Sequence, residues 1–315
     1  MGRARGSNAL LTGAFETTAG VAPGPGFAKM PFVSHTLGEE RPLIASDLLG
    51  QGREPQDPTP DVATNTGDVV VPVDVRNFWY WLKLFFGQPV SAAGSGAETV
   101  HTFTSGLLAL PSMSLEIGSP EIPTYSTHYG ARGNQLKISL ARSGLLNATC
   151  SLICIGESDP SATSISGAPT TKATQRFPQA TGSVKKDGAQ LGSVVAADFT
   201  FTNNLETVDT IKSDGRIEDS DPGMVGMSGS VTVRFKDTVL LAAASASPPT
   251  PVELDFGWTS GAHSLIFSVP RVFLPRPKRP ISGPNGIQAV FNWQASGAAA
   301  ASVIATLTND IASYA

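Results

Sequence analysis

Few residues of this chain combine the types and spacing that catalysis or metal binding requires. The sequence has no glycine-rich phosphate loop with its lysine, no nucleophile elbow and no dinucleotide fingerprint. Isolated carboxylates such as Glu116 and Asp255 are present, but nothing in the sequence arranges them as an acid–base pair. None of the four histidines has a metal-ligand spacing from another histidine or from a cysteine; they are His35, His101, His128 and His263. We therefore predict that the chain is not an enzyme and has neither a cofactor nor a metal site.

Two polar, turn-rich segments resemble each other although they lie in different halves of the chain. Residues 52–58 read GREPQDP, and residues 215–222 read GRIEDSDP. Their carboxylates could hold a hard cation such as Ca²⁺, which takes several oxygen ligands. However, the second segment lacks the glycine and glutamate spacing of an EF-hand loop, and the first has fewer carboxylates. A solvated loop or an interface loop is favoured at both places.

The densest positive segment is RVFLPRPKRP, residues 271–280. Its prolines favour a rigid extended edge or loop over a helix. It could contact nucleic acid or an acidic partner. Because the whole chain carries a net charge of −4, a solvated loop or a donor of salt bridges between subunits is the favoured interpretation.

The composition bounds the fold class. Charged residues make up 15% of the 315 residues and form no block of one sign, so tight binding to a nucleic-acid backbone or an anionic membrane is not expected. Abundant glycine (32) and proline (24) favour many short strands joined by turns, that is, a mainly β protein. The N-terminal residues lack the continuous apolar core of a signal peptide, and no stretch approaches the roughly 18 apolar residues of a membrane span. We expect a protein made and kept in a cytosol, with no membrane anchor.

A strand followed by a helix occurs in both halves. Val69, Val71 and Val73 share one face of a predicted strand, and the helix after it is expected to be capped by Asp74 and to stop at Gly87. Val231, Val233 and Phe235 form the matching face in the second half, where Asp237 is the expected cap. The aromatic residues of the first helix cover almost its whole circumference, which predicts cover by its own core plus a neighbouring subunit or repeat. The aromatic residues singled out for this role are Phe78, Trp79, Trp81 and Phe85.

Further segments follow in the same order in each half. Residues 101–106 and 111–118 alternate between apolar and polar, as do residues 251–258 and 263–270, and each pair is expected to form a hairpin. Each half then ends on two more predicted strands, and the strand that carries Cys150 and Cys154 is expected to bury both thiols without a disulfide. The ordered series indicates a duplication, with a first unit at residues 1–158, a linker or crossover at 159–178 and a second unit at 179–315.

Several segments together are similar to the tail tube (major tail) proteins of long-tailed bacteriophages and prophages. The similarity spans nearly the whole chain and includes RGSNALLTGAFETTAGVAP, LPSMSLEIG, FTNNLETVDTIKSDGRIEDSDPG, GSVTVRFKDTVLLAAA and FLPRPKRPISGPNGIQAVFNWQA. This resemblance implies two tandem β-sandwich or barrel units, each with one short α-helix, whose inner strands join those of neighbours around a channel. With two units per chain, three chains would form a pseudo-sixfold ring.

The resemblance also implies the location and the partners. It implies a virion protein of the phage tail, assembled in the host bacterial cytoplasm, whose trimeric or hexameric rings stack into a channel for genome ejection. Tape-measure, tail terminator and distal tail proteins are the implied partners, and double-stranded DNA would pass without specific binding. A charge-poor, net acidic subunit suits such passage, because a lumen dense in Lys and Arg would hold the duplex.

The two similar polar segments acquire a role from this resemblance. In the resembled family such loops reach along the tail axis, so we predict heterologous contacts between rings at these segments. The predicted ring-stacking residues are Asp47, Arg53, Glu54, Asp57, Asp214, Arg216, Glu218, Asp219 and Asp221. The alternative is a trimeric β-rich receptor- or carbohydrate-binding module of a phage tail, which would need a concave site lined by exposed aromatic residues.

Overall fold

The computed structural model describes residues 3–279, 281, 283, 286–298 and 301–314. Strands predominate in this part of the chain, with two α-helices and two short 3-10 helices. The first half contains η1 (Gly6–Asn8), β1 (Leu10–Phe15), β2 (Ala28–Lys29), β3 (Ser34–His35), β4 (Gly38–Glu40), β5 (Leu43–Ile44), β6 (Thr59–Pro60), β7 (Thr64–Pro72), α1 (Trp79–Phe86), β8 (Val90–Ala93), β9 (Thr99–Thr104), β10 (Met113–Ser119), β11 (Thr124–Ala141), β12 (Asn147–Cys154) and β13 (Gly156–Glu157). The second half contains η2 (Gln179–Thr181), β14 (Ser183–Lys186), β15 (Ala189–Gln190), β16 (Val194–Thr202), β17 (Glu206–Val208), β18 (Asp219–Asp221), β19 (Gly226–Arg234), α2 (Val239–Ala244), β20 (Val252–Ser260), β21 (His263–Phe273), β22 (Gln288–Ala295) and β23 (Ile304–Asn309). The mainly β prediction is confirmed.

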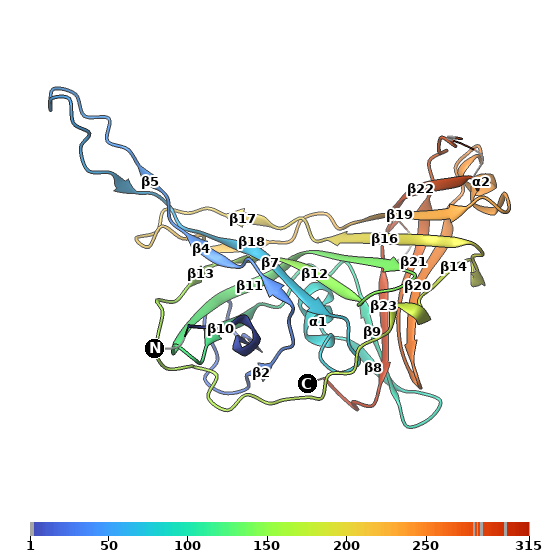
Figure 1. Ribbon diagram of the computed structural model, residues 1–315, viewed down its shortest axis with the longest axis horizontal. Coiled ribbons are helices and arrows are strands. Elements are labelled where there is room, and N and C mark those ends of the chain that lie inside the picture. Colours follow the sequence, from blue (N-terminus) through green and yellow to red (C-terminus); the bar gives the residue numbers. More distant parts are fainter. Residues whose placement is uncertain (1–2, 280, 282, 284–285, 299–300, 315) are drawn as a thin grey trace.

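Strands of both halves belong to one large antiparallel sheet. At one edge, β3 and β4 pair with β7. From β7 each strand pairs with the next in the order β7, β12, β11, β16, β19, β22 and β21. From β21 the sheet continues through β23 and β9 to β8, while β20 and β14 pair on from the opposite side of β21. The first and second halves therefore meet twice, at the β11–β16 pair and at the β9–β23 pair (Figure 1).

Strand β11 connects two parts of this sheet. Its first residues pair with β10, which in turn pairs with β1, and its later residues pair with β12 and β16. The register shifts between Gly133 and Gln135, where the strand passes over α1. A Cβ at Gly133 would lie 2.7 Å from Cδ1 of Phe85, so glycine allows the helix to pack directly on the strand.

A single buried core extends through both halves. It includes Val69, Val71 and Val73 of β7 and continues to Phe256, Phe267 and Phe291 of the second half. Cys150 and Cys154 lie on the buried side of β12 and are free thiols, as predicted. Burial raises the pKa of both thiols, and for Cys150 the carboxylate of Asp68 adds to the effect.

One expected hairpin forms and the other does not. Strands β20 and β21 pair up to Ser260 and His263 across a turn in which Gly261 has a φ of 65°, so the hairpin of residues 251–270 is confirmed. The hairpin expected from residues 101–106 and 111–118 is wrong. Strand β9 pairs with β8 and β23, whereas β10 pairs with β1 and β11. Alternation predicts that each segment is a strand, but it does not choose the partner strand.

The first helix begins later than expected. Asp74 does not cap it; one carboxylate oxygen accepts a hydrogen bond from the backbone N–H of Asn77 at 2.9 Å, within a turn that precedes α1. The prediction of Asp74 as the helix cap is therefore wrong, because its carboxylate orders this turn instead. The predicted end at Gly87 is confirmed, since this glycine has a φ of 84° and its N–H bonds to the carbonyl of Lys83. In the second half Asp237 accepts from the N–H of Val239, the first residue of α2.

The order of elements repeats more closely than the pairing does. The two closing strands β11 and β12 of the first half pair with each other, whereas β22 and β23 of the second half both pair with β21. Residues 159–178 contain no helix or strand and run along the first half, where Thr170 bonds with Phe27 and Lys29. The division into two tandem units stays a prediction.

Candidate assembly surfaces

A long two-stranded arm, residues 41–62, projects from the body of the protein (Figure 1). Its strands β5 and β6 pair only with each other, ending at Ile44 opposite Thr59. Five large apolar side chains on it are exposed: Leu43 (64%), Ile44 (53%), Leu48 (66%), Leu49 (92%) and Val62 (57%). An isolated hairpin with exposed leucines gains little from packing on its own body, which is typical of a segment that contacts another molecule.

Four of the predicted ring-stacking residues lie on this arm. Asp47, Arg53, Glu54 and Asp57 are all exposed, and in the described part of the chain none of them forms an ion pair. Their charges therefore face solvent. A partner that meets the arm would meet three carboxylates and one guanidinium here.

The second polar segment lies against the base of the arm. Arg216 donates two hydrogen bonds to the carboxylate of Glu39, from Nε at 2.7 Å and from Nη2 at 3.0 Å. The N–H of Ala63 bonds to the carbonyl of Gly215, and Arg41 bonds to the carbonyl of Asp214. The second segment thus contacts the base of the arm whose outer part carries the first segment.

The remaining predicted residues of the second half divide between half-buried and exposed positions. Asp219 forms an ion pair with Arg132 at 2.6 Å, and Arg132 also donates to the carbonyl of Ser220. Glu218 and Asp221 are exposed. Asp214 and Arg216 contact the base of the arm, and Asp219 holds the same segment against Arg132 of β11.

A buried polar cluster beside this base was not found by sequence reasoning. His128 is buried and lies 3.1 Å from the side-chain amide of Asn65 and 3.8 Å from the carboxylate of Glu157. Burial lowers the pKa of His128, although the carboxylate of Glu157 acts in the opposite direction. No local motif marks these residues, because Asn65, His128 and Glu157 come from three separate strands.

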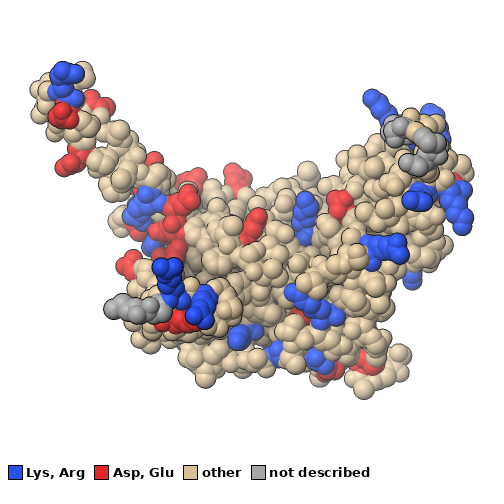
Figure 2. All heavy atoms as spheres, in the orientation of Figure 1, with Lys and Arg blue, Asp and Glu red and all other residues tan. Residues whose placement is uncertain are grey.

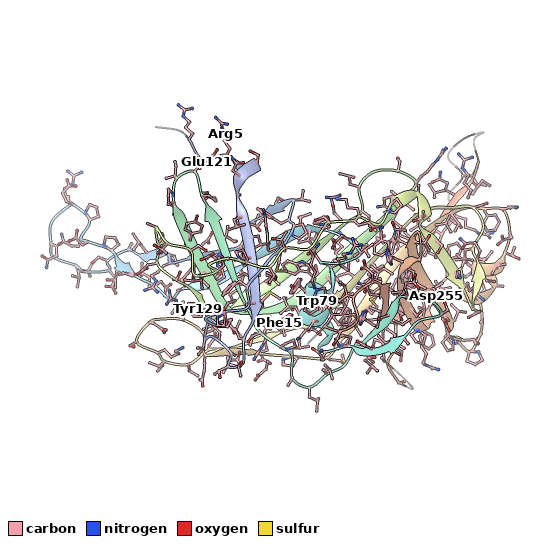
Figure 3. The ribbon with its side chains drawn as sticks, turned by 90° about the horizontal axis from the view of Figure 1, so that it is seen from below. Arg5, Phe15, Trp79, Glu121, Tyr129 and Asp255 are labelled. Atoms are coloured by element: carbon pink, nitrogen blue, oxygen red, sulfur yellow. The ribbon has the colours of Figure 1, made fainter. Side chains whose placement is uncertain are left out.

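The aromatic residues of α1 are covered by the chain itself. Phe78, Trp79, Trp81 and Phe85 each have at most 5% of their surface exposed. Phe15 of β1 lies against Trp79 with ring centroids 6.1 Å apart (Figure 3). The second half supplies Phe201 against Phe85 and Tyr314 stacked on Trp79. These four side chains therefore leave little surface for a neighbouring subunit.

The large sheet has several outer edges. Strand β7, which carries Val69, Val71 and Val73, is not an edge strand, because it pairs with β12 on one side and with β3 and β4 on the other. The outermost strands include β3 and β4 at one end and β8 at another, and β2 and β15 end further branches of the sheet. All four residues of β8 are exposed, and Val90 is exposed by 74%. These edges present backbone groups that a strand from another chain can pair with.

The two carboxylates named from the sequence, Glu116 and Asp255, lie on different strands, β10 and β20. Glu116 is buried and accepts hydrogen bonds from the Ser164 hydroxyl and the Ile165 N–H, while Asp255 lies on β20 (Figure 3). Among the residues that the structure describes, no group of three or more His, Cys, Asp or Glu is placed to hold a metal ion. Within the same residues, no helix has the length and apolarity needed to cross a bilayer.

Comparison with known proteins agrees with an assembly role for these surfaces. A family model described as phage tail tube protein matches residues 6–295. The chain belongs to the phage tail tube protein family. No curated protein matches the chain. Membership decides against both an enzyme and the receptor-binding alternative: this tail tube protein is a structural component of the virion and self-assembles into the tube.

Proposed function

We propose that this tail tube protein forms its tube through two kinds of contact. Within a ring, the β8 edge of one chain pairs with the β3 and β4 edge of the next, so that the sheets join around a channel. Between rings, the arm reaches the neighbouring ring. The projecting arm with its exposed leucines carries the second part, since nothing in its own chain covers them (Figure 1).

The ring itself is proposed to contain three chains. The repeated order of strand, helix, hairpin and closing strands supports two tandem units per chain, so that three chains make a pseudo-sixfold ring. In this arrangement Asp47, Arg53, Glu54 and Asp57 make the contacts between rings from the arm, and Glu218 and Asp221 add exposed carboxylates from the second half. Asp214 and Arg216 serve the stacking indirectly, because they hold the base of the arm, and Asp219 holds the same segment against Arg132 of β11.

The proposed partners are those of a tail tube. Tape-measure, tail terminator and distal tail proteins would contact the tube at its lumen and ends, and double-stranded DNA would pass through it during ejection. The net charge of −4 supports passage without retention, because duplex DNA carries about one negative charge per 1.7 Å.

Negative-stain electron microscopy of the concentrated protein tests tube formation, and hollow rods are expected. The arm is tested by replacing residues 45–58 with Asn-Gly, which joins Ile44 to Thr59 through a two-residue type I′ turn. We expect this variant to be soluble and to form no long tubes. Thermal unfolding is the control and should resemble that of the wild type, because the removed residues contact only one another. Long tubes from a folded, arm-shortened protein would contradict the role of the arm.

A further inference from the structure

An apolar hollow lies at the end of the molecule that carries β21 and β22. It has a volume of about 630 Å³ and most of its lining is apolar, from Pro249, Phe273, Leu274, Pro275 and Trp293. Asn292 and Gln294 add polar groups from β22. A cavity of this size and lining accepts apolar side chains from another molecule.

Positive charge accompanies this hollow. Arg271, Arg276, Lys278 and Arg279 lie on the same segment as Phe273, Leu274 and Pro275. Within the described residues none of these four side chains forms an ion pair. Figure 2 shows Lys and Arg side chains gathered at this end of the molecule. A surface of this kind fits a partner that is both apolar and acidic.

The arm has that chemistry. It exposes Leu43, Ile44, Leu48 and Leu49, and its outer part beyond β5 and β6 carries the carboxylates of Asp47, Glu54 and Asp57 with only Arg53 against them. The hollow and the arm therefore match in apolar surface and in charge. They lie toward opposite ends of the long axis of the molecule, so they cannot meet within one chain (Figure 1).

We propose that the tip of the arm of one copy docks in the hollow of a second copy, with its leucines among Phe273, Leu274 and Pro275 and its carboxylates beside Arg276 and Lys278. Because the two surfaces differ, the contact is heterologous and repeats from copy to copy. The inference rests on the proposed role of the arm in joining copies, and it names the surface that receives the arm.

A second apolar hollow is the competing receptor. It is lined by Leu107, Leu108 and Met224, of which Leu108 is exposed by 95% and Met224 by 86%. The carboxylate-bearing residue Asp221 directly precedes its lining residues Pro222 and Gly223. An acidic arm is repelled there, so the charges favour the hollow beside the basic segment.

Disulfide trapping between two full-length variants tests this docking. Leu49→Cys and Pro275→Cys each place a thiol on an exposed position, whereas the native Cys150 and Cys154 are buried and remain unreactive. After mixing under mild oxidation, a disulfide-linked dimer should form at least tenfold faster than in the matched mixture of Leu49→Cys with Leu108→Cys. Equal rates in the two mixtures, or faster trapping at Leu108→Cys, would overturn the proposal.

A charge exchange provides a second readout if a cysteine variant fails to fold. Asp57→Arg and Arg276→Glu should each reduce the amount of assembled tube at least fivefold, and a mixture of the two should recover part of it. Recovery of tubes in the mixture supports docking of the acidic arm on the basic segment. If both variants are folded and the mixture forms no more tubes than either variant alone, this result counts against the docking. If instead Arg276→Glu abolishes binding of a short DNA duplex while tubes form normally, the basic segment is a nucleic-acid contact and the proposal is wrong.

The results separate this inference from the proposed function. If the wild-type protein forms tubes but the Leu49→Cys and Pro275→Cys variants form no disulfide with each other, the hollow is not the receptor of the arm. The proposed tube is not affected by that result. Trapping between these positions in a protein that forms no tubes supports the docking and rejects the proposed stacking into a tube. Absence of both rejects both.

Discussion

At the scale of single residues, Glu39 is the group on which the position of the arm depends most directly. Its carboxylate accepts two hydrogen bonds from Arg216 and one from the N–H of Glu157 at 3.0 Å. Burial acts to raise the pKa of Glu39, but the hydrogen bonds from Arg216 and Glu157 and the positive charges nearby outweigh it, so the pKa lies below its usual value. The ionised form is therefore the one that stabilises the fold.

We predict that Glu39→Gln lowers the free energy of unfolding by about 1–3 kcal/mol at pH 7, because charge-assisted hydrogen bonds are lost. Since the pKa of Glu39 is lowered in the folded state, its contribution is present above about pH 4.3, the ordinary value for glutamate, and is lost as the pH falls through the folded pKa. Denaturant unfolding of the unassembled protein, followed by tryptophan fluorescence at several pH values, measures this. The control is Glu40→Gln, at the exposed neighbouring position. An equal effect of both variants, or a difference that persists at pH 2, would speak against the assignment.

At the scale of elements, β8 is the edge strand with the clearest free face. The N–H of Gly94 bonds to the carbonyl of Glu98, and hydrogen-bonded pairs alternate along an antiparallel ladder, so Ala92 and Val90 also bond toward β9. The N–H groups of Ser91 and Ala93 then point away from β9. They are available to a strand of a neighbouring chain.

We predict that Ala93→Pro reduces tube formation at least tenfold while leaving the monomer folded. Proline removes one outward donor without breaking a bond to β9, and it is tolerated on edge strands. Counting tubes in electron micrographs and comparing thermal unfolding measure the two effects. The matched control is Ala93→Val, which keeps the N–H and suits a strand. Normal tubes from the proline variant would show that this edge is not part of the ring contact.

At the scale of the whole molecule, the two halves are joined more closely than a pair of linked domains. Strand β9 of the first half pairs with β23, and Phe201 of the second half packs on Phe85 and Phe86. Residues 159–178 are therefore proposed to separate two units along the sequence only, because the residues before and after them share one hydrophobic core. With the two tandem units proposed above, such a body would present two similar but unequal lobes to its neighbours.

The ring should therefore show threefold symmetry with six similar lobes. End-on class averages of tubes in cryo-electron microscopy measure this directly, and the mass per ring should correspond to three chains. The physical reason is that each chain is proposed to contribute two units, whose closing strands pair differently, so that the units cannot be equivalent. Six chains per ring would contradict the proposed trimer.

The sequence by itself determined the local structure and the family. Alternation of apolar residues predicts the strands, Gly87 marks the end of α1, and the short turn at Gly261 predicts the β20–β21 hairpin, because each of these depends on residues close together in the chain. The repeated polar segments also indicate surface loops, and the arm confirms this for residues 52–58.

Only the tertiary structure decided which elements meet. Strand β9 finds its partner in β23, and Arg216 finds Glu39, although these residues are far apart in the sequence. The same long-range folding buries the aromatic face of α1 within the chain and leaves the arm free. Periodicity specifies which face of a strand or helix is apolar, but the choice of partner depends on the packing of the whole core, which no local pattern contains.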